Sequence, residues 1–211
     1  MKLYSYFRSS AAYRVRIALN LKDLPYEMAA IHLTRDGGQQ FKDSFRAINP
    51  QARVPALQLS SGEVLTQSLA IIAYLDEVFP DPPLLPVDAL DRARVRAAAQ
   101  VVACDIHPLN NLCALRYLKR ELHQEQAAID AWYHHWVIEG FTALEQMIEP
   151  GPYCFGSHVT LADVCLVPQV FNARRLNVPL AAFPKIVAVE TACLKLAAFD
   201  KARPEKQPDA E

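Results

Sequence analysis

Residues 4–19 read Tyr4-Ser-Tyr-Phe-Arg-Ser-Ser-Ala-Ala-Tyr-Arg-Val-Arg-Ile-Ala-Leu19, and this stretch decides how the first part of the chain folds. Leu3, Tyr4 and Tyr6 indicate the end of a short strand, and Ser9 and Ser10 stand where a helix should begin. A serine at this position caps the helix, or it lies where free amides and the helix dipole favour a bound anion. The local pattern alone favours capping. The helix itself is indicated by an apolar stripe at helical spacing, formed by Ala12, Val15, Ile17, Ala18 and Leu19.

Length and charge limit the kind of protein. The chain has 211 residues and a formal net charge of −1. Its length suits one large domain or two small ones with an ample core. The near-neutral charge gives no reason to expect a nucleic-acid partner. No uncharged apolar run of about 18 residues predicts a membrane span, and arginines interrupt the N-terminal stretch where a signal peptide would be apolar.

The cysteines indicate the redox environment. The five cysteines form no CxxC pair and no metal-like arrangement with the six histidines. An odd number of scattered cysteines is typical of reduced thiols. We therefore expect a cytoplasmic globular protein without a metal site.

The first third of the chain alternates strand-like and helix-like patterns. Asn49-Pro50 should end a short helix, because the residue before a proline is disfavoured in the helical region. The resulting order β-α-β-α-β-β-α predicts a mixed sheet covered by helices. After the opening strand and helix, strands are expected over 26–33, 56–59 and 63–65, and helices over 41–48 and 69–78, with a polar loop over 34–40.

A proline-rich linker over 79–87 divides the chain. We expect an α/β domain over 1–82 and an all-helical domain over 88–211. The residues from Lys201 onward carry charges and prolines and are expected to fray. In the second domain, helices are expected over 88–122 with an interruption at Pro108, and over 130–147, 160–173 and 184–196.

Val54-Pro55 precedes one of the expected strands. A cis bond there would turn Val54 outward, where its backbone could pair with a peptide-like ligand. Only about one X–Pro bond in twenty is cis in folded proteins, so the trans form is favoured for this bond taken alone.

Two further motifs begin helices, and a third ends one. Gln67-Ser68 opens the helix over 69–78, with Ser68 as its N-cap or, alternatively, as a contact for a ligand carboxylate. Thr160-Leu-Ala-Asp163 favours a capping box before an apolar run. Arg174-Arg175 indicates a solvated helix end, or a carboxylate site if a cleft lies nearby.

Taken together, these motifs occur in an order that resembles the glutathione transferases. The resemblance implies a thioredoxin-like N-terminal domain followed by an all-α domain. The stretch 9–19 is more narrowly similar to the signature of the zeta class, which contains maleylacetoacetate and maleylpyruvate isomerases. The other segments that fit this class are Gln39-Gln40, Asn49-Pro50, Val54-Pro55, Gln67-Ser-Leu-Ala-Ile71 and Asn172-Ala173.

The resemblance implies roles for single residues. Ser9 or Ser10 would hydrogen-bond the glutathione sulfur, and Ala11 replaces the cysteine that usually follows the two serines. The remaining implied contacts with glutathione are Gln40, the backbone of Val54, Gln67 with Ser68 at the γ-glutamyl end, His107 and Asn111.

The resemblance also implies a reaction. A glutathione thiolate would add to the cis double bond of a maleyl dicarboxylate, and elimination after rotation would return the trans isomer, so glutathione acts as a cofactor. Arg8 and Arg175 are the expected substrate-binding cations. Leu112 and Cys113 replace arginines implied for maleylpyruvate isomerases, which favours maleylacetoacetate, an intermediate of tyrosine and phenylalanine catabolism.

Other interpretations stay open at this point. The chain could isomerise maleylpyruvate, or it could transfer glutathione to 2-halo acids through the same thiolate. The fold could also serve as a non-catalytic, dimerising interaction module. In each case the resemblance implies a homodimer.

Overall fold

The computed structural model describes residues 1–149 and 151–211, which form two compact units. One unit comprises Met1–Pro83 together with Lys195–Glu211, and the other comprises Leu84–Leu194. The change from the first unit to the second falls inside the expected linker over 79–87.

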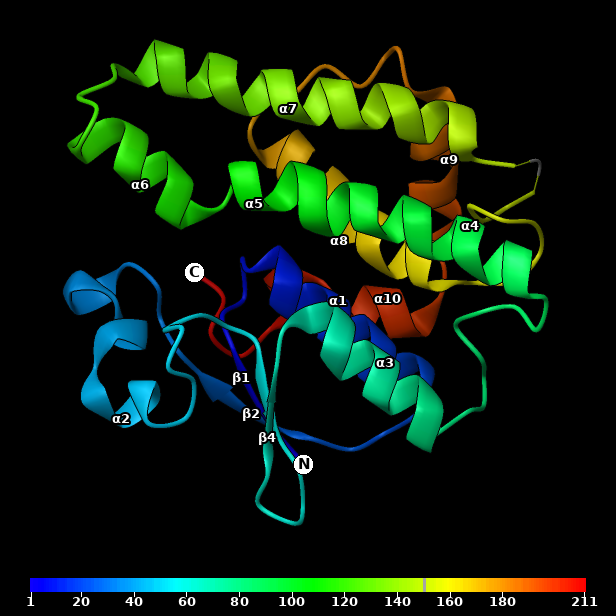
Figure 1. Cartoon of the computed structure of the whole chain (residues 1–211), viewed down its shortest axis with the longest axis horizontal. Helices are drawn as coiled ribbons and strands as arrows, with labels where there is room; N and C mark the ends of the chain where they lie inside the picture. Colours follow the sequence, from blue (N-terminus) through cyan, green and yellow to red (C-terminus); the bar gives the residue numbers. More distant parts are fainter. Residues whose placement is uncertain (150) are drawn as a thin grey trace. The chain divides into compact units, whose positions relative to one another are not determined.

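The first unit is built on a four-stranded sheet with strand order β2-β1-β3-β4 (Figure 1). Strand β1 pairs parallel with β2 and antiparallel with β3, and β3 pairs antiparallel with β4. Each strand expected from the sequence is present, and the mixed sheet is confirmed. The strands are β1 (Lys2–Ser5), β2 (Glu27–Ala30), β3 (Ala56–Gln58) and β4 (Val64–Thr66).

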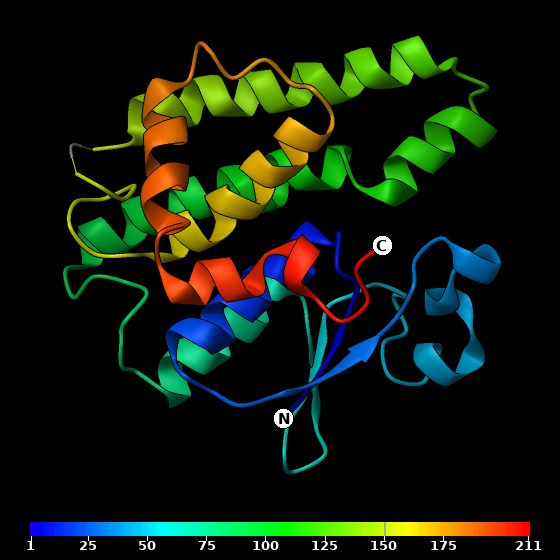
Figure 2. The ribbon, with the colours of Figure 1, turned by 180° about the vertical axis from the view of Figure 1, so that it is seen from behind.

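Three helices of the first unit lie side by side, with α1 in contact with both α3 and α10 (Figures 1 and 2). A shorter helix lies in the connection from β2 to β3, where the sequence predicted a helix over 41–48. The helices are α1 (Ser10–Leu21), α2 (Asp43–Arg46), α3 (Ser68–Val78) and α10 (Ala197–Ala202), with 3-10 turns η1 (Arg35–Gly37), η2 (Gln39–Phe41) and η4 (Pro204–Lys206).

Helix α1 forms the centre of this unit. Its expected apolar stripe is confirmed as core, because every one of those five side chains is fully buried. Burial extends further than the stripe, since all residues from Ser10 to Leu19 are buried, including Arg14 and Arg16. Two cations inside the core need polar partners there, and these partners connect α1 to the site described below.

The named elements of the second unit are helices and one π-helical turn, η3, along which the longest helix lies. In the described part of the chain, no helix combines the length and apolar composition needed to cross a membrane. The elements are α4 (Ala89–Gln100), the π-helical turn η3 (Val101–Ile106), α5 (His107–Leu109), α6 (Leu112–Arg120), α7 (Gln126–Met147), α8 (Leu161–Arg175) and α9 (Pro184–Cys193).

The interruption predicted at Pro108 is confirmed. Proline has no amide hydrogen, so the helix cannot continue regularly through this position. The chain adopts the π-helical turn η3 before it, with the amide of His107 donating to the carbonyl of Val102. A new helix, α6, begins after Asn111.

The capping box predicted at the start of α8 is confirmed. The Asp163 carboxylate accepts the amide of Thr160 at 2.7 Å and its hydroxyl at 2.8 Å, and it also accepts the amide of Cys154 at 2.7 Å. Asp163 is fully buried, and burial raises the pKa of its carboxyl group although the hydrogen bonds oppose that shift. The helix that follows is buried along most of its length, as its apolar sequence predicted.

The segment after Lys195 differs from its expected structure and place. We expected fraying from Lys201 and a position in the helical domain 88–211. The structure instead forms α10 and η4 there, with Ala202, Pro204 and Gln207 buried. The physical reason is that α10 packs on α1 and so belongs to the first unit.

The capping box allows a graded stability test. Asp163→Ala removes the acceptor of two buried amides and should lower the free energy of unfolding by about 3 kcal/mol. Thr160→Ala leaves the carboxylate in place and should cost only about 1 kcal/mol. Urea denaturation measures both, and equal losses for the two variants would contradict the central role of the carboxylate.

Candidate functional site

The register of the sheet brings four connections to one end. Tyr4 pairs with Ala56, and Ala56 pairs with Thr66, so the turn after β1, the entry to β3 and the exit from β4 lie at the same end. Ser5 pairs in parallel with Ala30, which adds the connection that leaves β2. We call this end of the sheet, marked by these five residues, the site edge.

The two serines begin α1 at the site edge, and the structure separates their roles. Ser9 is the N-cap, with its Oγ accepting the amide of Ala12 at 3.2 Å, and it is half-buried. Because the Oγ of Ser9 accepts this bond, its hydroxyl hydrogen can still be donated outward. Ser10 and Ala11 are the first helical residues, and both are buried.

A tight turn precedes Ser9. The amide of Ser9 donates to the carbonyl of Tyr6 at 2.9 Å, which closes the turn. Within it, the carbonyl of Phe7 accepts Nη2 of Arg16 at 3.1 Å. Arg8 is exposed, and its guanidinium lies over the Phe7 ring at 4.8 Å from the centroid. The turn therefore exposes a cation beside a fixed serine.

Val54 enters β3 at the same edge through a cis bond to Pro55, which corrects the trans form favoured from the sequence alone. Its side chain is buried in an apolar cluster with Tyr6, Phe7 and Phe45. Among the described residues, no partner hydrogen-bonds to the backbone of Val54. These backbone groups are available for strand-like pairing with an extended ligand.

The expectation that Ser68 caps α3 is wrong. The N-cap is Gln67, which has a φ of 67° and is exposed, and its Nε2 donates to Oε1 of Gln51 at 2.8 Å. Ser68 is the first helical residue and is buried, and its Oγ accepts Nη1 of Arg14 at 3.3 Å. The serine therefore joins α3 to α1 instead of capping its own helix.

Gln40 lies in the connection that leaves β2. Its side chain is buried, and its Nε2 donates to the carbonyl of Leu33 at 3.3 Å. The same loop is closed by Gln39, whose Oε1 accepts the amide of His32 at 2.9 Å. The structure thus gives the Gln40 side chain a place inside the loop, where it supports the local backbone.

His107 and Asn111, the two expected contacts in the second unit, are neighbours. Nδ2 of Asn111 lies 3.5 Å from Nε2 of His107. Asn111 is also the N-cap of α6, where its Oδ1 accepts the amide of Cys113 at 3.2 Å. The π-helical turn and Pro108 set the direction of this short segment, and both side chains are half-buried.

The two arginines at the end of α8 have different partners. Arg174 pairs with the buried carboxylate of Glu190 through Nε at 3.0 Å and Nη2 at 2.5 Å, which is a structural use. Arg175 is exposed, and its Nη2 donates to Oδ1 of Asn172 at 3.4 Å. Burial raises the pKa of Tyr133 to about 12, and the nearby charge of Arg175 opposes this shift.

The chemistry offered by the site edge is that of an anion site. Helices α1 and α3 both begin there, and neither has an acidic residue in its first turn among the described residues. Free amides and the positive ends of two helix dipoles therefore face the same region without a carboxylate of their own. An anionic ligand with peptide groups fits this combination.

Two residues that order this edge were not among the expected site residues. Arg14 and Arg16 carry hydrogen bonds to Ser68 and to the carbonyl of Phe7. Their position in the middle of an otherwise apolar helix is the signal that points to buried, structural cations.

Comparison with known proteins defines the class. Residues 3–83 match the glutathione S-transferase N-terminal domain, and residues 126–193 match the glutathione S-transferase C-terminal domain. The expected combination of a thioredoxin-like domain and a helical domain is therefore confirmed, and the chain belongs to the glutathione S-transferase family.

Its relatives narrow the class further. It is 50% identical to a maleylpyruvate isomerase from a Ralstonia species over 100% of both chains, and 49% identical to maleylacetoacetate isomerase of Pseudomonas aeruginosa over 99% of this chain and 98% of that one. A solved maleylpyruvate isomerase described as a bacterial zeta-class enzyme has a TM-score of 0.96 at 49% identity and covers 100% of both chains. A maleylacetoacetate isomerase from Methylobacterium extorquens, solved with bound malonate and glutathione, has a TM-score of 0.95 at 40% identity and the same coverage. The resemblance to the zeta class is thus confirmed.

The two serines should differ in stability. Ser9→Ala removes the N-cap acceptor and should lower the free energy of unfolding by about 1 kcal/mol. Ser10→Ala removes no cap and should stay within about 0.5 kcal/mol of the parent protein. Denaturation midpoints with unchanged slopes measure both, and a larger loss for Ser10→Ala would contradict the assigned N-cap.

Proposed function

We propose that this protein is a glutathione-dependent isomerase that converts maleylacetoacetate to fumarylacetoacetate. The observation that carries the proposal is the site edge, where two acid-free helix starts, a donor serine and an open backbone segment meet. Family membership and the isomerases named among its relatives support the same reaction.

Glutathione is the proposed cofactor, and its chemistry matches the edge. It is a peptide with carboxylates and a thiol, so it can pair with the backbone of Val54 while its γ-glutamyl end meets Gln67 and Ser68 at the start of α3. Gln40 contributes to the same site through the loop that it supports. His107 and Asn111 are further proposed contacts with glutathione.

Ser9 is the proposed donor to the glutathione sulfur. Its oxygen accepts the amide of Ala12, which leaves the hydroxyl hydrogen available to donate to a bound sulfur. Ser10 is buried and suits a packing role beside Ala11 at the start of α1. A thiol has a pKa of about 8.5, and a shift of one unit corresponds to about 1.4 kcal/mol. A hydroxyl donor together with a helix start can supply a shift of this size.

The thiolate then performs the reaction. Its lone pair forms a C–S bond to one carbon of the cis double bond, and the π electrons move into the conjugated carbonyl as a dienolate. The former double bond is now single and rotates freely. The electrons return, the C–S bond breaks, and the trans alkene and the thiolate are released. Glutathione is therefore regenerated unchanged.

A dicarboxylate substrate and its dienolate need cations. Arg8, exposed beside Ser9, is the proposed cation of the first unit. Arg175, exposed at the end of α8, is a second proposed cation. Such donors stabilise charge that develops during the reaction.

Maleylpyruvate is the second candidate substrate, because the Ralstonia relative is named for it and matches the whole chain at 50% identity. Maleylacetoacetate remains the first choice, since α6 begins with half-buried Leu112 and exposed Cys113 where the resemblance implies arginines for maleylpyruvate isomerases. We further propose a cytoplasmic homodimer.

A direct assay tests the reaction and the substrate. With glutathione, maleylacetoacetate should turn over with a higher kcat/KM than maleylpyruvate, and total glutathione should stay constant. Without glutathione, both rates should fall to background. Faster turnover of maleylpyruvate would reverse the substrate choice. Consumption of glutathione with halide release from 2-halo acids, and no isomerisation, would instead identify a transferase. Failure to bind glutathione would leave a non-catalytic interaction module.

Ser9 and Ser10 should also differ in catalysis. Ser9→Ala should lower kcat about tenfold, since it removes a donor that stabilises the thiolate by about one pKa unit, with glutathione affinity changed much less. Ser10→Ala is the matched control and should keep kcat. The ultraviolet thiolate absorbance of the glutathione complex reports the ionisation itself. Equal losses in kcat and affinity would make Ser9 a binding residue only.

A further inference from the structure

We propose that Asp209 is a positioning residue for the turn that leads into Ser9. The segment after α10, residues 203–211, which we call the final segment, thereby sets the geometry of the glutathione site. This inference rests on the proposed function, which it deepens by adding a residue that touches neither glutathione nor the substrate.

Two hydrogen bonds hold the turn at Phe7, one to its amide and one to its carbonyl. The amide of Phe7 donates to Oδ2 of Asp209 at 3.0 Å, and the carbonyl of Phe7 accepts Nη2 of Arg16 at 3.1 Å. Phe7 is buried and lies two residues before Ser9, inside the turn that the Ser9 amide closes onto Tyr6. Rotation of this peptide would therefore redirect both Arg8 and the Ser9 hydroxyl.

The Asp209 carboxylate is well placed for this contact. Its Oδ1 is buried and has no hydrogen-bond partner among the described residues, so the carboxylate is committed to Phe7 through its other oxygen. It also lies close enough to act on Arg16. Burial lowers the pKa of Arg16 to about 10, and the charge of Asp209 is among the influences that oppose this shift.

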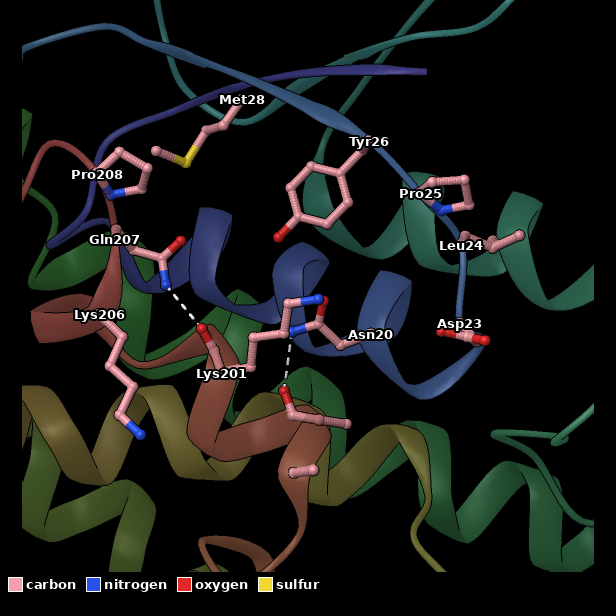
Figure 3. Close-up of a pocket in the computed structure, with 12 residues that line it drawn as sticks. Asn20, Asp23, Leu24, Pro25, Tyr26, Met28, Lys201, Lys206, Gln207 and Pro208 are labelled. Carbon is pink, nitrogen blue, oxygen red and sulfur yellow. Dashed lines mark hydrogen bonds between the residues drawn. The ribbon is translucent and has the colours of Figure 1, made fainter.

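The segment before Asp209 is itself fixed. Nε of Arg16 donates to the carbonyl of Ala202 at 3.0 Å, which joins α10 to α1. Nε2 of the buried Gln207 side chain donates to the carbonyls of Lys201 at 3.0 Å and Arg203 at 2.8 Å. Figure 3 shows this amide directed at the Lys201 carbonyl, with Pro208 following it. The chain thus reaches Asp209 along a defined path.

The same segment contacts a second connection of the site edge. The Glu211 carboxylate lies 2.9 Å from Nε2 of His32 and also pairs with Arg35. His32 in turn bonds Gln39 through its backbone, and that loop contains Gln40. The final segment therefore contacts both the connection that leaves β1 and the connection that leaves β2.

The test compares three variants of the full chain. Asp209→Ala leaves the buried Phe7 amide without an acceptor, while Asp209→Asn keeps an acceptor oxygen and should rescue it. Glu205→Ala is the matched control, because Glu205 is an exposed acid of the same segment that pairs with Arg203. Each is assayed for kcat, for the pH profile of kcat/KM, and for hydrogen exchange of the peptide that contains residues 6–10.

We expect Asp209→Ala to lower kcat about tenfold, to move the pH profile towards higher pH and to speed exchange in residues 6–10. Asp209→Asn and Glu205→Ala should stay within about twofold of the parent protein in kcat. An unchanged pH profile and unchanged exchange in Asp209→Ala would overturn the positioning role, and so would an equal effect of Glu205→Ala.

The same measurements distinguish failure of the proposed function from failure of the positioning role. A parent protein that isomerises neither maleyl substrate would disprove the reaction, whereas the exchange measurement would still decide whether Asp209 orders the turn. An active parent protein with a fully active Asp209→Ala variant would disprove the positioning role alone.

Discussion

The guanidinium of Arg16 is a charge buried in the core of the first unit, and the site edge depends on it. Taking such a charge out of water costs several kcal/mol unless hydrogen bonds replace the lost hydration. Arg16 donates to the hydroxyl of Ser5 at the end of β1, to the carbonyl of Phe7 and to the carbonyl of Ala202 in α10. Burial lowers the pKa of Arg16 to about 10, so it stays charged at neutral pH. One side chain therefore joins the sheet, the turn and a segment from the far end of the sequence.

The arrangement around Arg16 shows how a small mixed sheet brings two helix starts together. Antiparallel pairing of β1, β3 and β4 brings the starts of α1 and α3 to one edge, and the bond from Arg14 to Ser68 fixes these helices to each other. The amides and dipoles of these two helix starts favour negative charge at the edge, where Arg8 is exposed, while Arg14 and Arg16 are occupied inside the core. The Ser9 hydroxyl lies at the start of α1 on this edge, and it keeps a hydrogen that it can donate.

Features encoded by neighbouring residues were predictable from the sequence. The strand and helix around Ser9, the interruption at Pro108 and the capping box of Asp163 each depend on residues within a few positions. The partners of Ser68 and Phe7 were not predictable, because Arg14 lies 54 residues away from the first and Asp209 lies 202 residues away from the second. The prediction of fraying after Lys201 was wrong for the same reason, because the charges and prolines of a segment do not indicate which distant part of the chain packs against it.

The first unit is discontinuous in sequence, and this affects its assembly in the cell. Chains are synthesised from the N-terminus, and domains generally fold as units as they emerge. Here Arg16 emerges long before the carbonyl of Ala202 exists, and all of Leu84–Leu194 is translated in between. The sheet and α1 are therefore translated before the Ala202 carbonyl that accepts Nε of Arg16, and the first unit can reach its described contacts only after α10 has been made.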